Sequence, residues 1–401
     1  MNRAASVPSS SPVGAVMTLQ PSSEEAALRE SVAKIGRSFG HGYFMDKTRS
    51  GEPPTELWSE LGSHGFLGAS LPEEYGGGGQ GLWALTIVAE ELAAAGCPLL
   101  PLVFSQAICG NVLAKYGTAE QKERWLRGIA NGDIKFSFAI TEPDAGSNSH
   151  NLTTHAECRD ESWILRGQKT FISGVEDCDA LLVVARTGRH DKTGRGLLSL
   201  FVVDPDVPGL EKHLVPTAIQ APEKQWTLFF DDVLLPADRL VGQANEGLRA
   251  VFDGLNPERV LGAAFCTGIG RYALDKATRY ANEREVWGVP IGQHQGVAHP
   301  LAEAKIALEL ARLMMYKAAM LYEAGSAETG EVANMAKFAA AEAGTQCIDQ
   351  AVQVHGGNGV TLEYGLTDMY WLVRLLKIAP VSREMVLNFV AEHSLGLPKS
   401  Y

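Results

Sequence analysis

Three scarcities in the sequence narrow the class of protein. No stretch approaches the roughly 18–20 uninterrupted apolar residues of a membrane-spanning helix, so we expect a soluble protein with no membrane span. The chain has only six cysteines, irregularly spaced and without a C-x-x-C pair. This usage favours reduced thiols in a cytoplasmic protein over a disulfide framework, and it argues against a zinc site, so we expect no metal.

Positive charge is also in short supply. Lys and Arg number 35 against 47 Asp and Glu, which gives a formal net charge of −12. Such a surface repels nucleic acid, so we expect no nucleic-acid partner. A site for a phosphorylated cofactor must therefore be local, built from a few Arg or Lys side chains and from backbone N–H groups.

The period of the hydrophobic pattern changes twice along the chain. Residues 23–131 repeat at the helical spacing of three or four, residues 132–242 alternate with a period of two, and residues 243–401 are helical again. The sequence therefore predicts an α+β protein with an N-terminal helical domain, a middle antiparallel β domain and a C-terminal four-helix bundle. Residues 1–22 are small, polar and proline-bearing, and we expect a disordered tail there.

One predicted helix start bears on function. Pro257 suits the first turn of a helix with Asn256 as its N-cap, and Val260 and Leu261 then begin an apolar face. The first helix of the C-terminal bundle is therefore predicted to begin at this point, which would place Glu258 in its first turn.

Six motifs, in order along the chain, resemble the acyl-CoA dehydrogenase family. They are LPEEYGG (71–77), AITEPDAGS (139–147), GQKTFIS (167–173), FFDDV (229–233), NEREVWG (282–288) and AVQVHGGNG (351–359). Each string is weak alone, but the ordered set is specific, and the resemblance runs from about residue 23 to the C-terminus. The family's fold has the same order of helical, β and helical domains.

The resemblance implies a flavoenzyme that oxidises an acyl-CoA thioester to the trans-2-enoyl-CoA. A carboxylate takes the α-proton while the β-hydrogen leaves as hydride to flavin N5. The expected cofactor is FAD, and the expected electron acceptor is an electron-transfer flavoprotein or a similar protein. Members of the family are usually homotetramers, so we expect a homotetramer or a homodimer.

The TEPDAGS turn is the first expected contact with FAD. It is dense in small residues and exposed N–H groups, as contact with a flavin edge and a phosphate requires. By similarity, Phe138, Ile140 and the hydroxyl of Thr141 face the isoalloxazine, and Ser147 lies near the pyrophosphates. Ser147 and Arg259 are also expected to bind substrate. The alternative is a β-turn that binds nothing.

Phe171 and Ser173 are two apart on a predicted strand, so both should point to the same face. In the family this pair packs on the flavin, with the aromatic ring against it and the hydroxyl near N5. This sequence has Phe and Ser where many relatives have Trp and Thr. The alternative is a buried pair in a sheet without a cofactor.

A second set of expected FAD contacts lies in the C-terminal domain, and by similarity it serves the cofactor of a neighbouring subunit. Arginine suits a diphosphate because its planar fork can pair with two oxygens. For Arg284 the alternative is a charge that complements a helix dipole. The set comprises Arg284, Trp287, Gln295, Gln353 and Gly357.

The expected catalytic base is Glu258. Most relatives carry this Glu in a string near the C-terminus, but here the corresponding segment KIAPVSREM (377–385) has Ala379 or Pro380 at that position. Glu384 falls several residues too late, and we expect it on the following helix. A minority of the family places the base on the first helix of the C-terminal bundle, at the position of Glu258. A first-turn carboxylate is stabilised in its charged form, so burial would have to outweigh the helix dipole. The alternative is a first-turn helix carboxylate paired with a nearby Arg and without a catalytic role.

Two other interpretations share this fold. Some relatives are flavin monooxygenases or oxidases, and a relative without turnover could bind acyl-CoA alone. The usual Arg-Asp pair before the base segment is replaced here by Trp371 and Leu372, which changes the packing expected near the cofactor. Retention of Glu258 and of the C-terminal motifs favours the dehydrogenase.

Overall fold

The computed structural model of the chain describes residues 22–399. Nearly all of the tail expected over residues 1–22 lies outside the described residues. The first described helix begins directly after Ser22, whose hydroxyl caps it by accepting a hydrogen bond from the Glu25 N–H at 3.1 Å.

The N-terminal part of the chain is helical. α3 is buried along most of its length, so it forms the centre of this domain rather than its surface. The helices are α1 (Ser23–Ser50), α2 (Thr55–Ser63), α3 (Gly81–Ala94), the π-helical η2 (Leu102–Gly110), α4 (Asn111–Tyr116) and α5 (Ala119–Asn131), with the short η1 (Glu73–Tyr75) before α3.

The middle part is a single eight-stranded sheet. Its order is β6-β7-β3-β2-β4-β5-β8, with β1 also paired to β4. Most pairs are antiparallel, as expected, but β1 and β2 both run parallel to β4. The strands are β1 (Phe136–Ala139), β2 (His155–Arg159), β3 (Ser162–Ser173), β4 (Ala180–Arg189), β5 (Gly196–Val203), β6 (Leu210–Val215), β7 (Gln225–Pro236) and β8 (Leu240–Val241).

The C-terminal part has three long helices rather than four of equal length. The fourth part of the expected bundle, residues 366–394, is broken into α9, α10 and η8. The elements are α6 (Gly247–Glu283), a hairpin of β9 (Glu285–Val286) and β10 (Val289–Pro290), α7 (Gln295–Glu323), α8 (Thr329–His355), η7 (Gly356–Val360), α9 (Thr367–Leu375), α10 (Arg383–Phe389) and η8 (Val390–Ser394).

The predicted start of the first bundle helix is wrong. α6 begins at Gly247 and runs through Pro257, so Asn256 is not an N-cap. Proline has no N–H to donate and is costly inside a helix, yet it is buried here among α6's packing partners. Tertiary packing therefore overrides the local signal, and Glu258 lies in the interior of a helix.

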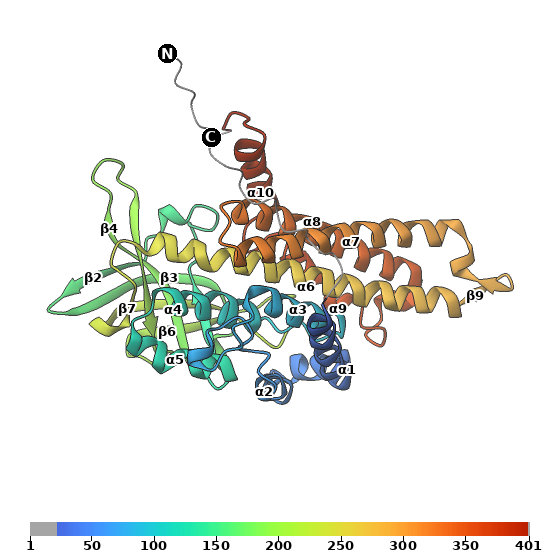
Figure 1. Ribbon diagram of the computed structural model, residues 1–401, viewed down its shortest axis with the longest axis horizontal. Coiled ribbons are helices and arrows are strands. Elements are labelled where there is room, and N and C mark those ends of the chain that lie inside the picture. Colours follow the sequence, from blue (N-terminus) through green and yellow to red (C-terminus); the bar gives the residue numbers. More distant parts are fainter. Residues whose placement is uncertain (1–21, 400–401) are drawn as a thin grey trace, which may run out of the picture.

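Figure 1 shows how α6 connects the two ends of the molecule. The sheet lies at one end, α6, α7 and α8 extend away from it, and the β9–β10 hairpin lies at the other end. α6 packs against α8, α3 and α7. The core is therefore continuous from the N-terminal helices into the bundle.

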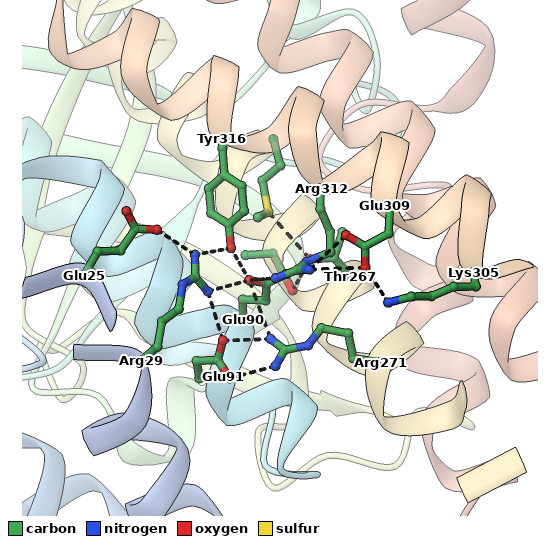
Figure 2. Close-up of polar contacts among 12 residues, drawn as sticks. Glu25, Arg29, Glu90, Glu91, Thr267, Arg271, Lys305, Glu309, Arg312 and Tyr316 are labelled. Carbon is green, nitrogen blue, oxygen red and sulfur yellow. Dashed lines mark hydrogen bonds and ion pairs between the residues drawn. The ribbon is translucent and has the colours of Figure 1, made fainter. Parts of the chain in front are cut away.

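A buried ionic network joins the N-terminal helices to the bundle (Figure 2). Glu90 of α3 is fully buried and accepts from Arg312 Nε at 2.6 Å and from Arg29 Nη1 at 3.1 Å. Arg271 donates twice to Glu91, at 2.8 and 2.9 Å. Burial would raise the pKa of Glu90, but Arg312, Arg271 and the Tyr316 hydroxyl outweigh it and hold the pKa at about 2.

Two features of the described chain bear on its chemistry. None of its helices is long and apolar enough to cross a membrane. All six cysteines, which fall within residues 22–399, are free thiols.

Candidate functional site

The TEPDAGS turn is fastened to strand β3. The Thr141 carbonyl accepts from the Thr170 N–H at 2.9 Å, and Glu142 pairs with Ala145 to close the turn. Ser147 follows on an exposed stretch. Two motifs whose nearest residues, Ser147 and Gly167, are 20 apart in the sequence therefore form one edge of the β domain.

A buried ion pair reinforces this junction. Lys169 Nζ lies 2.8 Å from Glu142 Oε1 and 2.9 Å from the Ile140 carbonyl oxygen, and neither charged side chain is more than 2% exposed. Glu142 also accepts from the Thr153 and Thr154 N–H groups at 2.6 and 3.0 Å. Burial lowers the pKa of Lys169 to about 8, whereas Lys169 and these bonds outweigh burial at Glu142 and lower its pKa to about 2.

Sequence reasoning missed this pair, although each partner lies in a motif already singled out. The available signal was an acidic side chain in one motif, which holds Glu142 and Asp144, and a lysine as the single charged residue of the other. Charged side chains in such a setting are buried only when paired. What the sequence could not show is that the two motifs meet.

Strand β3 is irregular where it presents Phe171. The register with β7 shifts between Lys169 and Ile172, and Phe171 has a φ of 55° and a 61% exposed side chain. Ser173 follows two residues on, and its hydroxyl accepts from Gln225 Nε2 at 2.9 Å. A strained backbone that turns a large aromatic ring outward suits a binding surface rather than a core.

Glu258 lies on α6, and one of its carboxyl oxygens is buried away from solvent. Its Oε2 is shielded from solvent and has no hydrogen-bond partner among residues 22–399. Burial raises the pKa of this carboxyl to about 7, while Arg259 and Lys337 act in the opposite direction. A carboxylate with such a pKa is half ionised at neutral pH and can accept a proton.

Arg259 adjoins Glu258 and is itself buried. Its Nη1 donates to Asn256 Oδ1 at 2.8 Å, and burial lowers its pKa. The Nε–H has no partner among the described residues. A guanidinium next to a carboxylate, with a donor left unused, has capacity to bind a further acceptor.

Helix η2 links the Glu258 region to the β-domain edge. It packs on both β1 and α6. The Ser105 hydroxyl accepts from the Phe136 N–H at 3.1 Å. Cys109 Sγ lies 4.0 Å from the Ser137 carbonyl oxygen. Burial raises the pKa of the Cys109 thiol, and the charge of Glu258 raises it further. The structure therefore brings Glu258 to the same region of the molecule as the junction of the TEPDAGS turn with β3. We call this junction the β1–β3 edge.

The second set of expected FAD residues gathers elsewhere. The set lies around the far ends of α6 and α8, where the Tyr280 and His355 rings stack 4.2 Å apart. This is the end of the bundle opposite the sheet (Figure 1). One chain does not bring this set to the β1–β3 edge. Its members, all exposed, are Arg284, Trp287, Gln295, Gln353 and Gly357.

The segment where many relatives carry their base lies between α9 and α10 and has no carboxylate there. Ala379 and Pro380 occupy it, and Glu384 falls in the first turn of α10 with a 72% exposed side chain. Glu384 is on the following helix, as predicted. Trp371, at the position of the missing charged pair, is 47% exposed, and Leu372 is buried.

Potential metal ligands do not cluster in the part of the chain that the structure describes. No group of three His, Cys, Asp or Glu side chains is arranged to hold a metal ion there.

Comparison with known proteins decides the family. Family models of the acyl-CoA dehydrogenase N-terminal, middle and C-terminal domains match residues 22–133, 137–233 and 245–395. The chain belongs to the acyl-CoA dehydrogenase family. It is an enzyme of that family, and its helical, sheet and helical order is the family's fold.

Individual relatives agree with this assignment. Acyl-CoA dehydrogenase FadE12 of Mycobacterium tuberculosis is 54% identical over 95% of this chain and 98% of its own length. The structure of a glutaryl-coenzyme A dehydrogenase–glutaryl-CoA complex superposes with a TM-score of 0.91 at 31% identity, covering 96% of this chain and 98% of the other. A glutaryl-CoA dehydrogenase of Mycobacterium smegmatis in complex with FADH2 gives 0.85 at 25% identity, covering 93% and 95%.

Proposed function

We propose that the protein catalyses FAD-dependent α,β-dehydrogenation of an acyl-CoA thioester, with Glu258 as the base. The observation that carries this proposal is the sealed, unpartnered Oε2 of Glu258. Its pKa of about 7 is near the optimum for a general base at neutral pH. Membership of the family supplies the reaction class.

The residues present fit FAD. An aromatic side chain that is 61% exposed at a backbone φ of 55° has little purpose on a bare surface, but it suits contact with an isoalloxazine ring. Phe171, Ser173, Thr141 and the backbone at Phe138 and Ile140 would hold the ring, and Ser147 the pyrophosphate. When bound, FAD would accept the hydride from the β-carbon.

Glu258 performs the proton transfer. The α C–H bond breaks and its electron pair forms the new carbon–carbon double bond as the β-hydrogen departs, while the proton passes to Oε2 of Glu258. A low-dielectric pocket strengthens this base, since burial disfavours the carboxylate and favours its protonated product. Arg259 stabilises the resting carboxylate and, with Ser147, would bind the substrate's polar part.

A second subunit completes the cofactor site in this proposal. The exposed set at the far end of the bundle cannot reach the β1–β3 edge of its own chain (Figure 1). Arg284 and Trp287 would therefore serve the FAD of a neighbouring copy in a homodimer or homotetramer. Helix α7 presents apolar side chains that are 50% or more exposed at Ile306, Leu310 and Leu313, one face of a helix suited to such an interface.

Reoxidation of FAD requires an external acceptor. We expect an electron-transfer flavoprotein or a similar protein in this role. The free thiols agree with a reducing compartment, and the cytoplasm is the location we propose.

The test is anaerobic titration of the purified protein with a panel of acyl-CoAs while the visible absorbance of the flavin is followed. We expect bleaching in the wild type and in the control Glu384→Gln, and none in Glu258→Gln. Bleaching that survives in Glu258→Gln would remove Glu258 as base. No bleaching with any thioester, despite bound FAD, would overturn the dehydrogenase assignment.

A further inference from the structure

Lys337 is a buried cation that the mechanism above does not use. It lies on α8 and is 1% exposed. α8 packs against α6 along much of its length. An ammonium group is seldom buried unless it has partners, so its surroundings indicate its role.

The ammonium holds the segment between α9 and α10. Lys337 Nζ donates to the Val381 carbonyl oxygen at 2.5 Å. Glu342, further along α8, accepts from Lys377 Nζ at 2.8 Å and from Arg383 Nε at 2.9 Å. The segment is thus held at both ends by Glu342 and near its middle by Lys337.

Lys337 also faces the helix that carries the base. The charged or titratable groups around it are Glu258, Arg259 and Cys266 on α6 and Glu384 on α10. Burial lowers the pKa of Lys337 to about 8, so the group is mostly protonated at neutral pH. It therefore carries its charge under the conditions in which Glu258 must work.

The surroundings of Glu258 show what this charge does. Its charge interacts with Arg259 on its own helix, with Lys337 on α8 and with the thiol of Cys109 on η2, and its Oε2 accepts no hydrogen bond from any described residue. Burial raises its pKa, and the two cations are what oppose it. Without one of them, more of the carboxyl would be protonated at neutral pH, and a protonated carboxyl cannot accept the α-proton.

We infer that Lys337 is a positioning residue for the base: it supports the carboxylate form of Glu258 from α8 and, through Val381, holds the segment that lacks a carboxylate at the usual base position. This inference rests on the proposed role of Glu258. A base on α6 leads to two requirements, and Lys337 meets both. The carboxylate needs a counter-charge, and the segment left without a Glu needs another anchor.

The experiment compares Lys337→Met with Lys337→Arg and with the control Lys377→Met, which loosens the same segment but does not face Glu258. The rate of anaerobic flavin reduction by a reactive acyl-CoA is measured from pH 5.5 to pH 9.5. In Lys337→Met the midpoint of the rise in rate with pH should move upward by about one pH unit, because a nearby opposite charge is lost. The rate should then fall about tenfold at pH 6 and recover at pH 9.

The matched variants separate an effect of the Lys337 charge from a general structural effect. Lys337→Arg keeps the charge and should keep the midpoint, and Lys377→Met should also keep it. A loss by the same factor at every pH in Lys337→Met would show a structural role only and would overturn the inference. An unchanged profile in Lys337→Met would overturn it as well.

A second readout separates this inference from the proposed function. The infrared band of the protonated Glu258 carboxyl, identified as the band missing in Glu258→Gln, can be titrated without any turnover. We expect it to persist to higher pH in Lys337→Met, or in Lys337→Gln if the Met variant does not fold. An unmoved band would reject the role of Lys337. Failure of every acyl-CoA to reduce the wild type would reject the proposed function alone.

Discussion

At Glu258 two opposing effects meet at one carboxyl. A pKa of about 7 against an ordinary value of 4.5 corresponds to about 3 kcal/mol of penalty on the charged form, at about 1.4 kcal/mol for each pKa unit. Burial supplies that penalty, and Arg259 and Lys337 limit it. Because Glu258 lies inside α6 rather than in its first turn, the helix dipole expected to oppose burial is not the deciding factor.

Glu223 gives a prediction for stability at the same scale. This carboxyl is 9% exposed, both its oxygens are sealed and unpartnered within residues 22–399, and burial raises its pKa to about 8. The folded protein therefore holds a proton that the unfolded chain releases above pH 4.5. Stability should be lost as the pH rises from about 4.5 through 8.

Glu223→Gln should remove this loss. We expect the variant to raise the melting temperature by a few degrees at pH 8.5 and to change it little at pH 5, measured by calorimetry with FAD bound. Glu211→Gln, at a residue whose side chain is 75% exposed, is the control and should be neutral at both pH values. A variant that is equally stabilised at both pH values would show that proton uptake is not the cause.

At the scale of elements, the junction of β3 with the TEPDAGS turn depends on the Lys169–Glu142 pair. Breaking a buried pair by removing one partner leaves an uncompensated charge and typically destabilises by about 3–5 kcal/mol. Lys169→Met should therefore lower the free energy of unfolding by that amount and weaken retention of FAD during gel filtration. The control is Lys212→Met, since Lys212 pairs with the largely exposed Asp206 at 2.9 Å on the same domain. Full FAD retention in Lys169→Met would contradict this account of the turn.

The buried ionic network around Glu90 of α3 joins the N-terminal helices to the bundle, and its contribution to stability can be measured (Figure 2). Glu90→Gln leaves three arginines facing a neutral group, and we expect the free energy of unfolding in urea to fall by about 3–5 kcal/mol at pH 7. Because the folded pKa of Glu90 is about 2, the wild type should lose this contribution as the pH falls from about 4.5 toward 2. Glu309→Gln, whose side chain is 41% exposed at the rim, should cost less than about 1 kcal/mol. Equal losses in the two variants would contradict the importance of burial.

The elements also show what sequence can and cannot predict. The order of helical, β and helical parts follows from a change of period, and Glu384 on a separate helix follows from its distance past the segment. The prediction for the start of α6 was wrong because Asn256 and Pro257 form a strong local signal that tertiary packing overrides. The parallel pairing of β1 and β2 with β4 depends on contacts between distant segments, which periodicity does not report.

The candidate site divides in the same way. Motif resemblance placed Thr141, Phe171 and Glu258 on elements that meet near η2. It did not reveal the bulge that turns Phe171 outward, because Phe gives no local signal for a positive φ. Lys337 was missed altogether, because a lysine on an alanine-rich helix looks in sequence like an exposed one.

At the scale of the whole molecule, the separation of the two cofactor-binding sets predicts complementation between subunits. In a mixed oligomer of Glu258→Gln and Arg284→Ala chains, one site would combine an intact base with an intact Arg284 of the neighbour. Dissociating and reassembling the two inactive variants together should therefore restore activity, to about a quarter of the sites in a random mixture of dimers. The control mixes Glu258→Gln with Glu258→Gln/Arg284→Ala and should restore none. Absence of recovery in the first mixture, with mixed oligomers shown by mass spectrometry, would place Arg284 outside the shared site.

The central claim is that Glu258 removes the α-proton. The most direct measurement uses an acyl-CoA in which sulfur replaces the β-methylene, which can lose an α-proton but cannot be dehydrogenated. Exchange of its α-protons with solvent deuterium is followed by proton NMR with the wild type, Glu258→Gln and Glu384→Gln, each with FAD bound. We predict exchange with the wild type and with Glu384→Gln, and none above the uncatalysed rate with Glu258→Gln. Exchange that continues at the wild-type rate in Glu258→Gln would contradict the account.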